Sequence, residues 1–136
     1  MAKKLRGACL CGAVKFSVED DFRTFYQCHC KQCQQQSGSA FAANIFTRPD
    51  NVEWIEGEEN IICYQHPSRS FSNAFCKGCG CSVPYLVASG KALIVPAGAL
   101  LDEASIRPKA NIFRDEQACW FGEGLQAESF AGFPKK

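Results

Sequence analysis

Apolar and polar residues alternate in short stretches along most of this chain. In one such stretch, apolar Val14, Phe16 and Val18 stand at every second position. A period of two is typical of a β-strand that buries one face. The same pattern, bounded by turn residues, predicts strands over 13–18, 22–27, 41–47, 52–55, 60–65, 70–75, 82–87, 92–95 and 111–114, and around Trp120-Phe121.

Helical periodicity is almost absent from the sequence. One short helical turn is expected in the Gln-rich run between Cys30 and Ser37, ended near Gly38, with its glutamines in solvent. Turn residues recur roughly every ten residues along the rest of the chain. The pattern predicts an all-β fold of several short antiparallel sheets without an internal repeat. No linker is visible, so we expect residues 1–136 to form a single domain.

Charge and hydropathy argue against a nucleic-acid partner and against a membrane partner. The 15 Lys and Arg residues nearly balance the 14 Asp and Glu residues, and no basic stripe supports a nucleic-acid partner. The basic ends, 3–6 and 135–136, are expected to be solvated termini. No apolar run approaches the roughly 20 residues of a membrane span, and no apolar segment follows the first lysines as in a signal peptide. We therefore expect a cytoplasmic protein without a membrane partner, whose oligomeric state the sequence leaves open.

Ten cysteines in 136 residues indicate metal binding. In a reducing compartment, C-x-C and C-x-x-C spacings favour metal ligation over disulfides. Cys28, Cys30 and Cys33, with His29 between them, place three thiols and an imidazole in one short turn. Three sulfur ligands leave one tetrahedral position of a zinc ion open, as in catalytic sites. The alternative is a closed structural site whose fourth sulfur comes from Cys63, Cys81 or Cys119.

A second set of four cysteines forms a complete ligand set. Cys9 and Cys11 come from one tight turn, and Cys76 and Cys79 from another. Four thiolates saturate a zinc ion, so this set predicts a structural metal that contributes folding energy. A redox role for Cys76 and Cys79 would require a βαβ context, which is missing. Gly7 and Gly12 are expected to allow the tight backbone of the first turn, and Gly78 and Gly80 to adopt positive φ so that backbone N–H groups of the second turn point toward sulfur.

Five stretches together resemble a known family. They are GACLCGAV (7–14), CHCKQC (28–33), SGSAF (37–41), FCKGCG (75–80) and PAGALLD (96–102). In this order they are similar to the glutathione-dependent formaldehyde-activating (GFA) domain, also found in centromere protein V. The similarity extends from about residue 7 to Trp120.

The resemblance implies a β-tent fold with two zinc sites. By similarity, Cys9, Cys11, Cys76 and Cys79 match the structural zinc ligands, and Cys28, Cys30 and Cys33 the ligands of a second, catalytic zinc. The implied activity is condensation of formaldehyde with glutathione to S-(hydroxymethyl)glutathione, a carbon–sulfur lyase reaction in reverse. The chain departs from the family pattern at Asn111, where many members have histidine, and in the extra residues Cys63, Cys81 and Cys119.

The ligand set favours one chemistry over others. A zinc ion with three thiolates carries a net charge of about −1, which suits holding an incoming thiolate better than activating water for hydrolysis. His29 could shuttle the proton, but neighbouring side chains in an extended backbone alternate, so we expect it to face away from the metal. Lys31 is expected to be exposed, Cys63 and Cys119 to be small buried hydrophobes, and Cys81 to lie near either zinc. The rival interpretations are a non-catalytic two-zinc scaffold that binds a protein, and a zinc or oxidant sensor.

Overall fold

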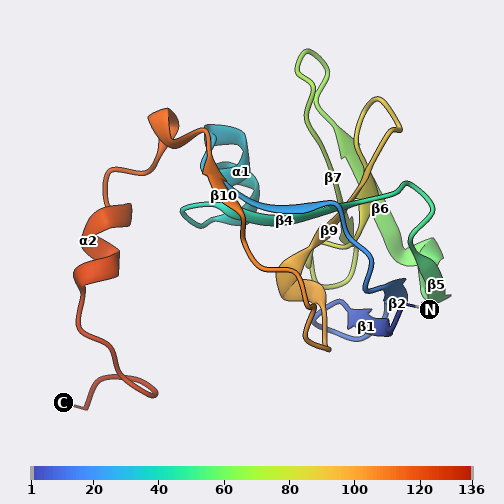
Figure 1. Ribbon diagram of the computed structural model, residues 1–136, viewed down its shortest axis with the longest axis horizontal. Helices are drawn as coiled ribbons and strands as arrows, with labels where there is room; N and C mark the ends of the chain where they lie inside the picture. Colours follow the sequence, from blue (N-terminus) through green and yellow to red (C-terminus); the bar gives the residue numbers. More distant parts are fainter. Residues whose placement is uncertain (1, 136) are drawn as a thin grey trace.

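The computed structural model describes residues 2–135 as a mainly β structure (Figure 1). Its strands form three sheets, ordered β1-β2-β5, β10-β3-β4-β9-β8 and β6-β7. The strands are β1 (Lys4–Ala8), β2 (Lys15–Glu19), β3 (Thr24–Cys28), β4 (Ala42–Thr47), β5 (Glu53–Glu56), β6 (Ile61–Gln65), β7 (Ser72–Cys76), β8 (Tyr85–Leu86), β9 (Leu93–Pro96) and β10 (Ala110–Ile112). Helices α1 (Lys31–Ser37) and α2 (Phe121–Gln126) and short 3-10 turns at Glu58–Asn60, Ala97–Ala99 and Arg114–Glu116 complete the chain.

The predicted all-β class is confirmed, with one change in the expected pairing. Nearly all neighbouring strands are antiparallel, but β10 runs parallel to β3. The predicted pair around Ser89-Gly90 is present, because Tyr85 and Leu86 of β8 pair with Ile94 and Leu93 of β9. The predicted helical turn is α1, which ends at Gly38 in the left-handed conformation.

Two predictions about the ends of the chain were wrong. The N-terminal basic segment is not a solvated end but strand β1, because Leu5 is fully buried between charged neighbours that face solvent. The segment after Trp120 is helix α2 rather than a strand. Lys136, at the basic C-terminal end, lies outside the described residues.

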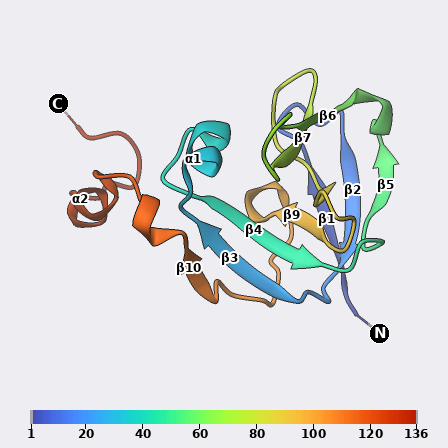
Figure 2. The same cartoon turned by 90° about the horizontal axis from the view of Figure 1, so that it is seen from above.

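The main core lies between the two larger sheets, whose strands cross at a wide angle in Figure 2. Gly7 of β1 is required there by a close approach: a Cβ at this position would lie 2.1 Å from Cζ of Phe16. We expected this glycine to allow the tight metal-binding turn. It instead makes room for the Phe16 ring in the core. The buried members of the core are Leu5, Phe16, Val18, Ile45, Leu93, Val95 and Ala99.

A smaller core joins the first hairpin to the third sheet. It contains Cys9, Val14, Ala74, Cys76 and Val83, so two of its members are candidate metal ligands. The β6–β7 hairpin extends from this point away from the larger sheets, with α1 facing it (Figures 1 and 2). Among residues 2–135, no helix has the length and apolar character needed to cross a membrane.

Candidate metal centres

The four-cysteine centre, formed by Cys9, Cys11, Cys76 and Cys79, connects distant parts of the chain. All four sulfur atoms lie within 4.8 Å of one another. The Cys9–Cys11 Sγ distance is 3.7 Å and the Cys11–Cys76 Sγ distance is 3.8 Å. Sulfurs at the corners of a tetrahedron with Zn–S bonds of about 2.3 Å are about 3.8 Å apart. The residues present therefore fit a tetrahedral metal ion of this size.

Backbone N–H groups surround these sulfurs, as predicted. Val14 N–H donates to Cys9 Sγ at 3.2 Å, and Gly78 N–H donates to Cys76 Sγ at 3.3 Å. A backbone hydrogen bond from Cys11 is the main cause that lowers the pKa of Cys79 to about 6. Gly80 has the expected positive φ, at 77°, but the same expectation for Gly78 was wrong. These donors stabilise negative charge on sulfur, which a metal-bound thiolate carries.

The three-cysteine centre lies where β3 meets α1. Cys28 is the last residue of β3, Cys30 caps the N-terminus of α1, and Cys33 lies in its first turn. Their sulfurs lie within 4.8 Å of one another, and Cys33 N–H donates to Cys30 Sγ at 3.4 Å. A hydrogen bond from Cys33 lowers the pKa of Cys28 to about 6, while the same bond raises the pKa of Cys33. Cys28 is thus the thiol of the set that ionises most readily, and the three sulfurs together can hold one metal ion.

The extra cysteines do not complete this centre. Within residues 2–135, neither Cys63 nor Cys119 joins a cluster of potential ligands, and both are exposed, so the prediction that they are buried was wrong. Cys63 lies in β6, most of whose residues are exposed, and Cys119 lies just before α2. Cys81 packs beside the four-cysteine centre, where its S–H donates to Ser82 O at 3.4 Å.

His29 faces away from the sulfurs, as expected for a side chain between two ligands. It is fully buried between the rings of Phe41 and Phe121, at centroid distances of 5.2 and 4.8 Å. Its Nε2 lies 3.1 Å from Oδ1 of Asn111, the position at which the sequence departs from the family pattern. His29 therefore packs α2 and β10 against the base of α1, and it does not reach a metal held by the three sulfurs.

The glutamines of α1 are not all solvated, contrary to expectation. Gln34 donates to the carbonyl oxygens of His29 and Glu116 at 2.8 and 2.9 Å, and Gln36 donates to Ser82 Oγ at 2.8 Å. These bonds hold the helix of the three-cysteine centre to β7–β8 and to the segment before α2. Lys31 is exposed, as predicted.

A cavity of about 670 Å³ opens beside the three-cysteine centre. This volume is within the range of roughly 300–1,000 Å³ that is typical of small-molecule sites. The sequence did not predict the cavity, because its walls come from separate strands and loops without a shared motif. Its apolar and aromatic lining includes Phe46, Phe71, Tyr85, Ile94 and Phe113, and its charged lining consists of Lys31, Arg69 and Glu116.

Comparisons with known proteins agree with this arrangement. A Halomonas elongata protein, provisionally named a glutathione-dependent formaldehyde-activating enzyme, is 25% identical over 140 residues, covering 96% of this chain and 88% of that protein. An uncharacterized lyase of Schizosaccharomyces pombe is 30% identical over 86 residues, covering 62% of this chain and 59% of that protein.

The fold also matches a solved structure. A crystal structure of a Rhodobacter sphaeroides protein superposes with a TM-score of 0.60 at 23% identity, covering 78% of this chain and 97% of that chain. The model of the GFA family, described as glutathione-dependent formaldehyde-activating enzyme, matches residues 4–116, which include both cysteine centres. The chain therefore belongs to the GFA family.

Proposed function

We propose that this chain is a zinc-dependent enzyme of the carbon–sulfur lyase type that acts on the adduct of a thiol and an aldehyde. The reaction would join glutathione and formaldehyde to S-(hydroxymethyl)glutathione, or separate them again. One observation carries the proposal: of two cysteine centres, one has four sulfurs, and the other has three and borders a cavity. Only the second can accept a further sulfur ligand from a substrate.

The two centres are assigned different roles. The sulfur distances near 3.8 Å and the connection between the first hairpin and β7 support a structural zinc at the four-cysteine centre. The short sequence span of the three-cysteine centre and its position at a cavity wall support a catalytic zinc. The assigned ligands are Cys9, Cys11, Cys76 and Cys79 for the structural ion, and Cys28, Cys30 and Cys33 for the catalytic ion.

The proposed chemistry follows from the charge of the ligand set. Zinc, when bound, supplies a positive centre that keeps an incoming thiol ionised and holds it beside the aldehyde. The three cysteinates make the net charge of the loaded centre about −1, which disfavours activation of water. The apolar part of the cavity lining offers a surface on which a small aldehyde can lie beside the thiol.

Tyr85 is the residue best placed to assist the aldehyde oxygen. When the thiol sulfur bonds to the carbonyl carbon, the thiol proton is released and the oxygen gains negative charge and then a proton. Tyr85 lines the cavity, and burial, followed by the charges of the nearby cysteines, raises the pKa of its hydroxyl. The phenol therefore stays protonated near neutral pH and can donate a hydrogen bond to the oxygen. His29 has no such role, because it packs on the other side of the turn.

Exchange spectroscopy tests the proposal directly. We expect the zinc-loaded protein to accelerate exchange between ¹³C-labelled formaldehyde and its glutathione adduct, measured by NMR. Cys30→Ser, which removes one ligand of the three-cysteine centre, should abolish the acceleration. An inert protein that carries two tightly bound zinc ions would instead support the scaffold interpretation.

The proposal requires only a small thiol and a small aldehyde as partners. All ten cysteines are free thiols in the structure, which suits a reducing compartment such as the cytoplasm.

A further inference from the structure

Arg69 is the one arginine of the described residues whose side chain has no protein partner. Within residues 2–135, its guanidinium makes no ion pair and no hydrogen bond, whereas each of the other five arginines makes at least one. Those five bind carboxylates, a backbone carbonyl or a side-chain amide: Arg6 to Asp102, Arg23 to Lys91, Arg48 to Asp21, Arg107 to Glu103 and Arg114 to Gln117. An unpartnered guanidinium has five N–H donors available to a ligand.

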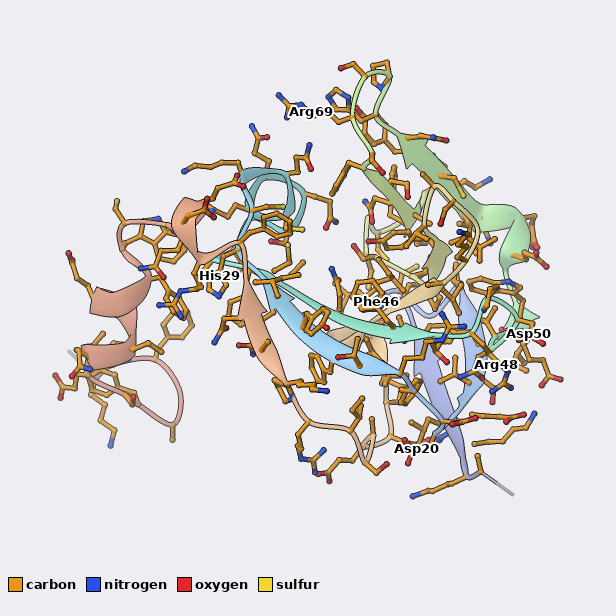
Figure 3. The ribbon with its side chains drawn as sticks, turned by 45° about the horizontal axis from the view of Figure 1, so that its top comes forward. Asp20, His29, Phe46, Arg48, Asp50 and Arg69 are labelled. Carbon is orange, nitrogen blue, oxygen red and sulfur yellow. The ribbon has the colours of Figure 1, made fainter. Side chains whose placement is uncertain are left out.

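Arg69 lies at the cavity of the three-cysteine centre. It is at the tip of the β6–β7 hairpin, on the side that faces α1 (Figure 3). It lines both that cavity and the adjoining hollow of about 460 Å³, which α1 borders with Gln32, Gln35 and Gln36. A molecule held at the three cysteines can therefore extend toward Arg69 without leaving the cavity.

The backbone of the hairpin tip is ordered by His66. Its Nδ1 accepts N–H bonds from Ser68 and Arg69, both at 3.1 Å. Two bonds to one ring nitrogen close the turn and fix the direction in which the Arg69 side chain leaves it. The tip thus presents the guanidinium from a defined turn.

The remaining charges of the cavity leave Arg69 available for an anion. Glu116 is the lining carboxylate, and its Oε1 already accepts the Lys31 N–H at 3.0 Å. It makes no ion pair with Arg69 among the described residues. The hairpin therefore adds a positive charge to the cavity that no carboxylate among residues 2–135 neutralises.

We propose that Arg69 is a specificity-determining residue that binds a carboxylate of the thiol substrate, so that the site selects anionic thiols over neutral thiols of the same size. This inference rests on the proposed function, because it requires a thiol at the three-cysteine centre. Guanidinium and carboxylate groups form paired N–H···O bonds, which fix orientation as well as adding affinity. Lys31 adds a second positive charge at the same cavity, but as a flexible point charge it does not fix orientation.

Two thiols of equal length test the inference. The cobalt-substituted protein is titrated with 3-mercaptopropionate and with 3-mercapto-1-propanol, and the sulfur-to-metal charge-transfer absorption reports binding. In Arg69→Gln, we expect the Kd for 3-mercaptopropionate to rise about 10-fold, or about 1.4 kcal/mol, and the Kd for the alcohol to stay within about 2-fold. Arg107→Gln removes an exposed arginine outside the cavity and serves as the matched control.

Each other outcome overturns the inference in a distinguishable way. Equal weakening of both thiols would mean that Arg69 only offsets the charge of the metal centre. Unchanged binding of both would mean that Arg69 does not contact the substrate. If neither thiol alters the spectrum of the cobalt protein that retains Arg69, the proposed function itself fails.

Discussion

Loss of one ligand should have very different consequences at the two centres. Cys79→Ser opens the four-cysteine centre, and Cys30→Ser opens the three-cysteine centre. Both side chains are only partly buried, so neither change removes much core packing. Serine is also a good helix N-cap, so Cys30→Ser keeps the acceptor for the Cys33 N–H at the start of α1.

The expected difference follows from the chain segments that each metal connects. Cys11 and Cys76 are separated by 65 residues, whereas Cys28 and Cys33 are five positions apart. Because the cost of closing a loop grows with the logarithm of its length, the longer closure constrains the unfolded chain by about 2 kcal/mol more. Structural zinc binding contributes roughly 10–16 kcal/mol, similar to or above the roughly 5–15 kcal/mol stability of whole domains. Cys79→Ser should therefore unfold or aggregate the protein, and Cys30→Ser should remain folded with one zinc ion.

Circular dichroism melts and metal counts on the two purified variants measure this difference. Cys81 lies beside the four-cysteine centre, and its sulfur could replace that of Cys79. Both measurements are therefore repeated on the two variants with Cys81→Ser added. The reasoning is refuted if Cys30→Ser melts as early as Cys79→Ser, since the three-cysteine centre would then be structural.

Three further changes test other parts of the account. Gly7→Ala places a Cβ against the Phe16 ring and should lower the free energy of unfolding by about 1–3 kcal/mol in denaturant titrations; an unchanged midpoint would contradict the packing argument. Arg6 holds the pKa of Asp102 well below its usual range, so this carboxylate stabilises the fold above its unfolded pKa of about 4, and the contribution is lost on acidification. Asp102→Asn should therefore reduce stability more at pH 7 than at pH 2, where the contribution is only partly lost, and an equal loss at both would count against the ion pair. Tyr85→Phe should slow adduct exchange roughly 100-fold while leaving thiol binding to the cobalt protein unchanged, and weaker thiol binding would show a packing role instead.

Local sequence patterns predicted most strands because alternation records which face is buried. Strand β1 was missed because Leu5 and Gly7 are its only uncharged interior residues, and the glycine has a role only in contact with Phe16. Helix α2 was predicted as a strand because an aromatic pair favours strands locally, whereas its position is set by Phe121 packing on His29.

The cysteine centres were visible in the sequence because tight spacings bring together the three sulfurs of one centre and each pair of sulfurs of the other, although the fold must join those two pairs. The cavity was not visible, because its lining depends on how separate strands cross. Arg69 illustrates this limit: nothing in its neighbours distinguishes it from a solvated hairpin residue, and only its place opposite α1 gives it a role. The burial of Cys63 was predicted from residue type, but in β6 most residues are exposed, Cys63 included.

X-ray absorption at the zinc edge tests the central claim most directly, because it counts the sulfurs around the metal. With one four-sulfur and one three-sulfur site, the protein loaded with two zinc ions should average about 3.5 sulfurs per zinc, at Zn–S distances of about 2.3 Å. Glutathione at millimolar concentration should raise this average to about 4, and it should have no such effect when the three-cysteine centre is removed by Cys30→Ser. An average of 4 before glutathione is added, or one that glutathione leaves at 3.5, would contradict a three-cysteine centre that binds the substrate thiol.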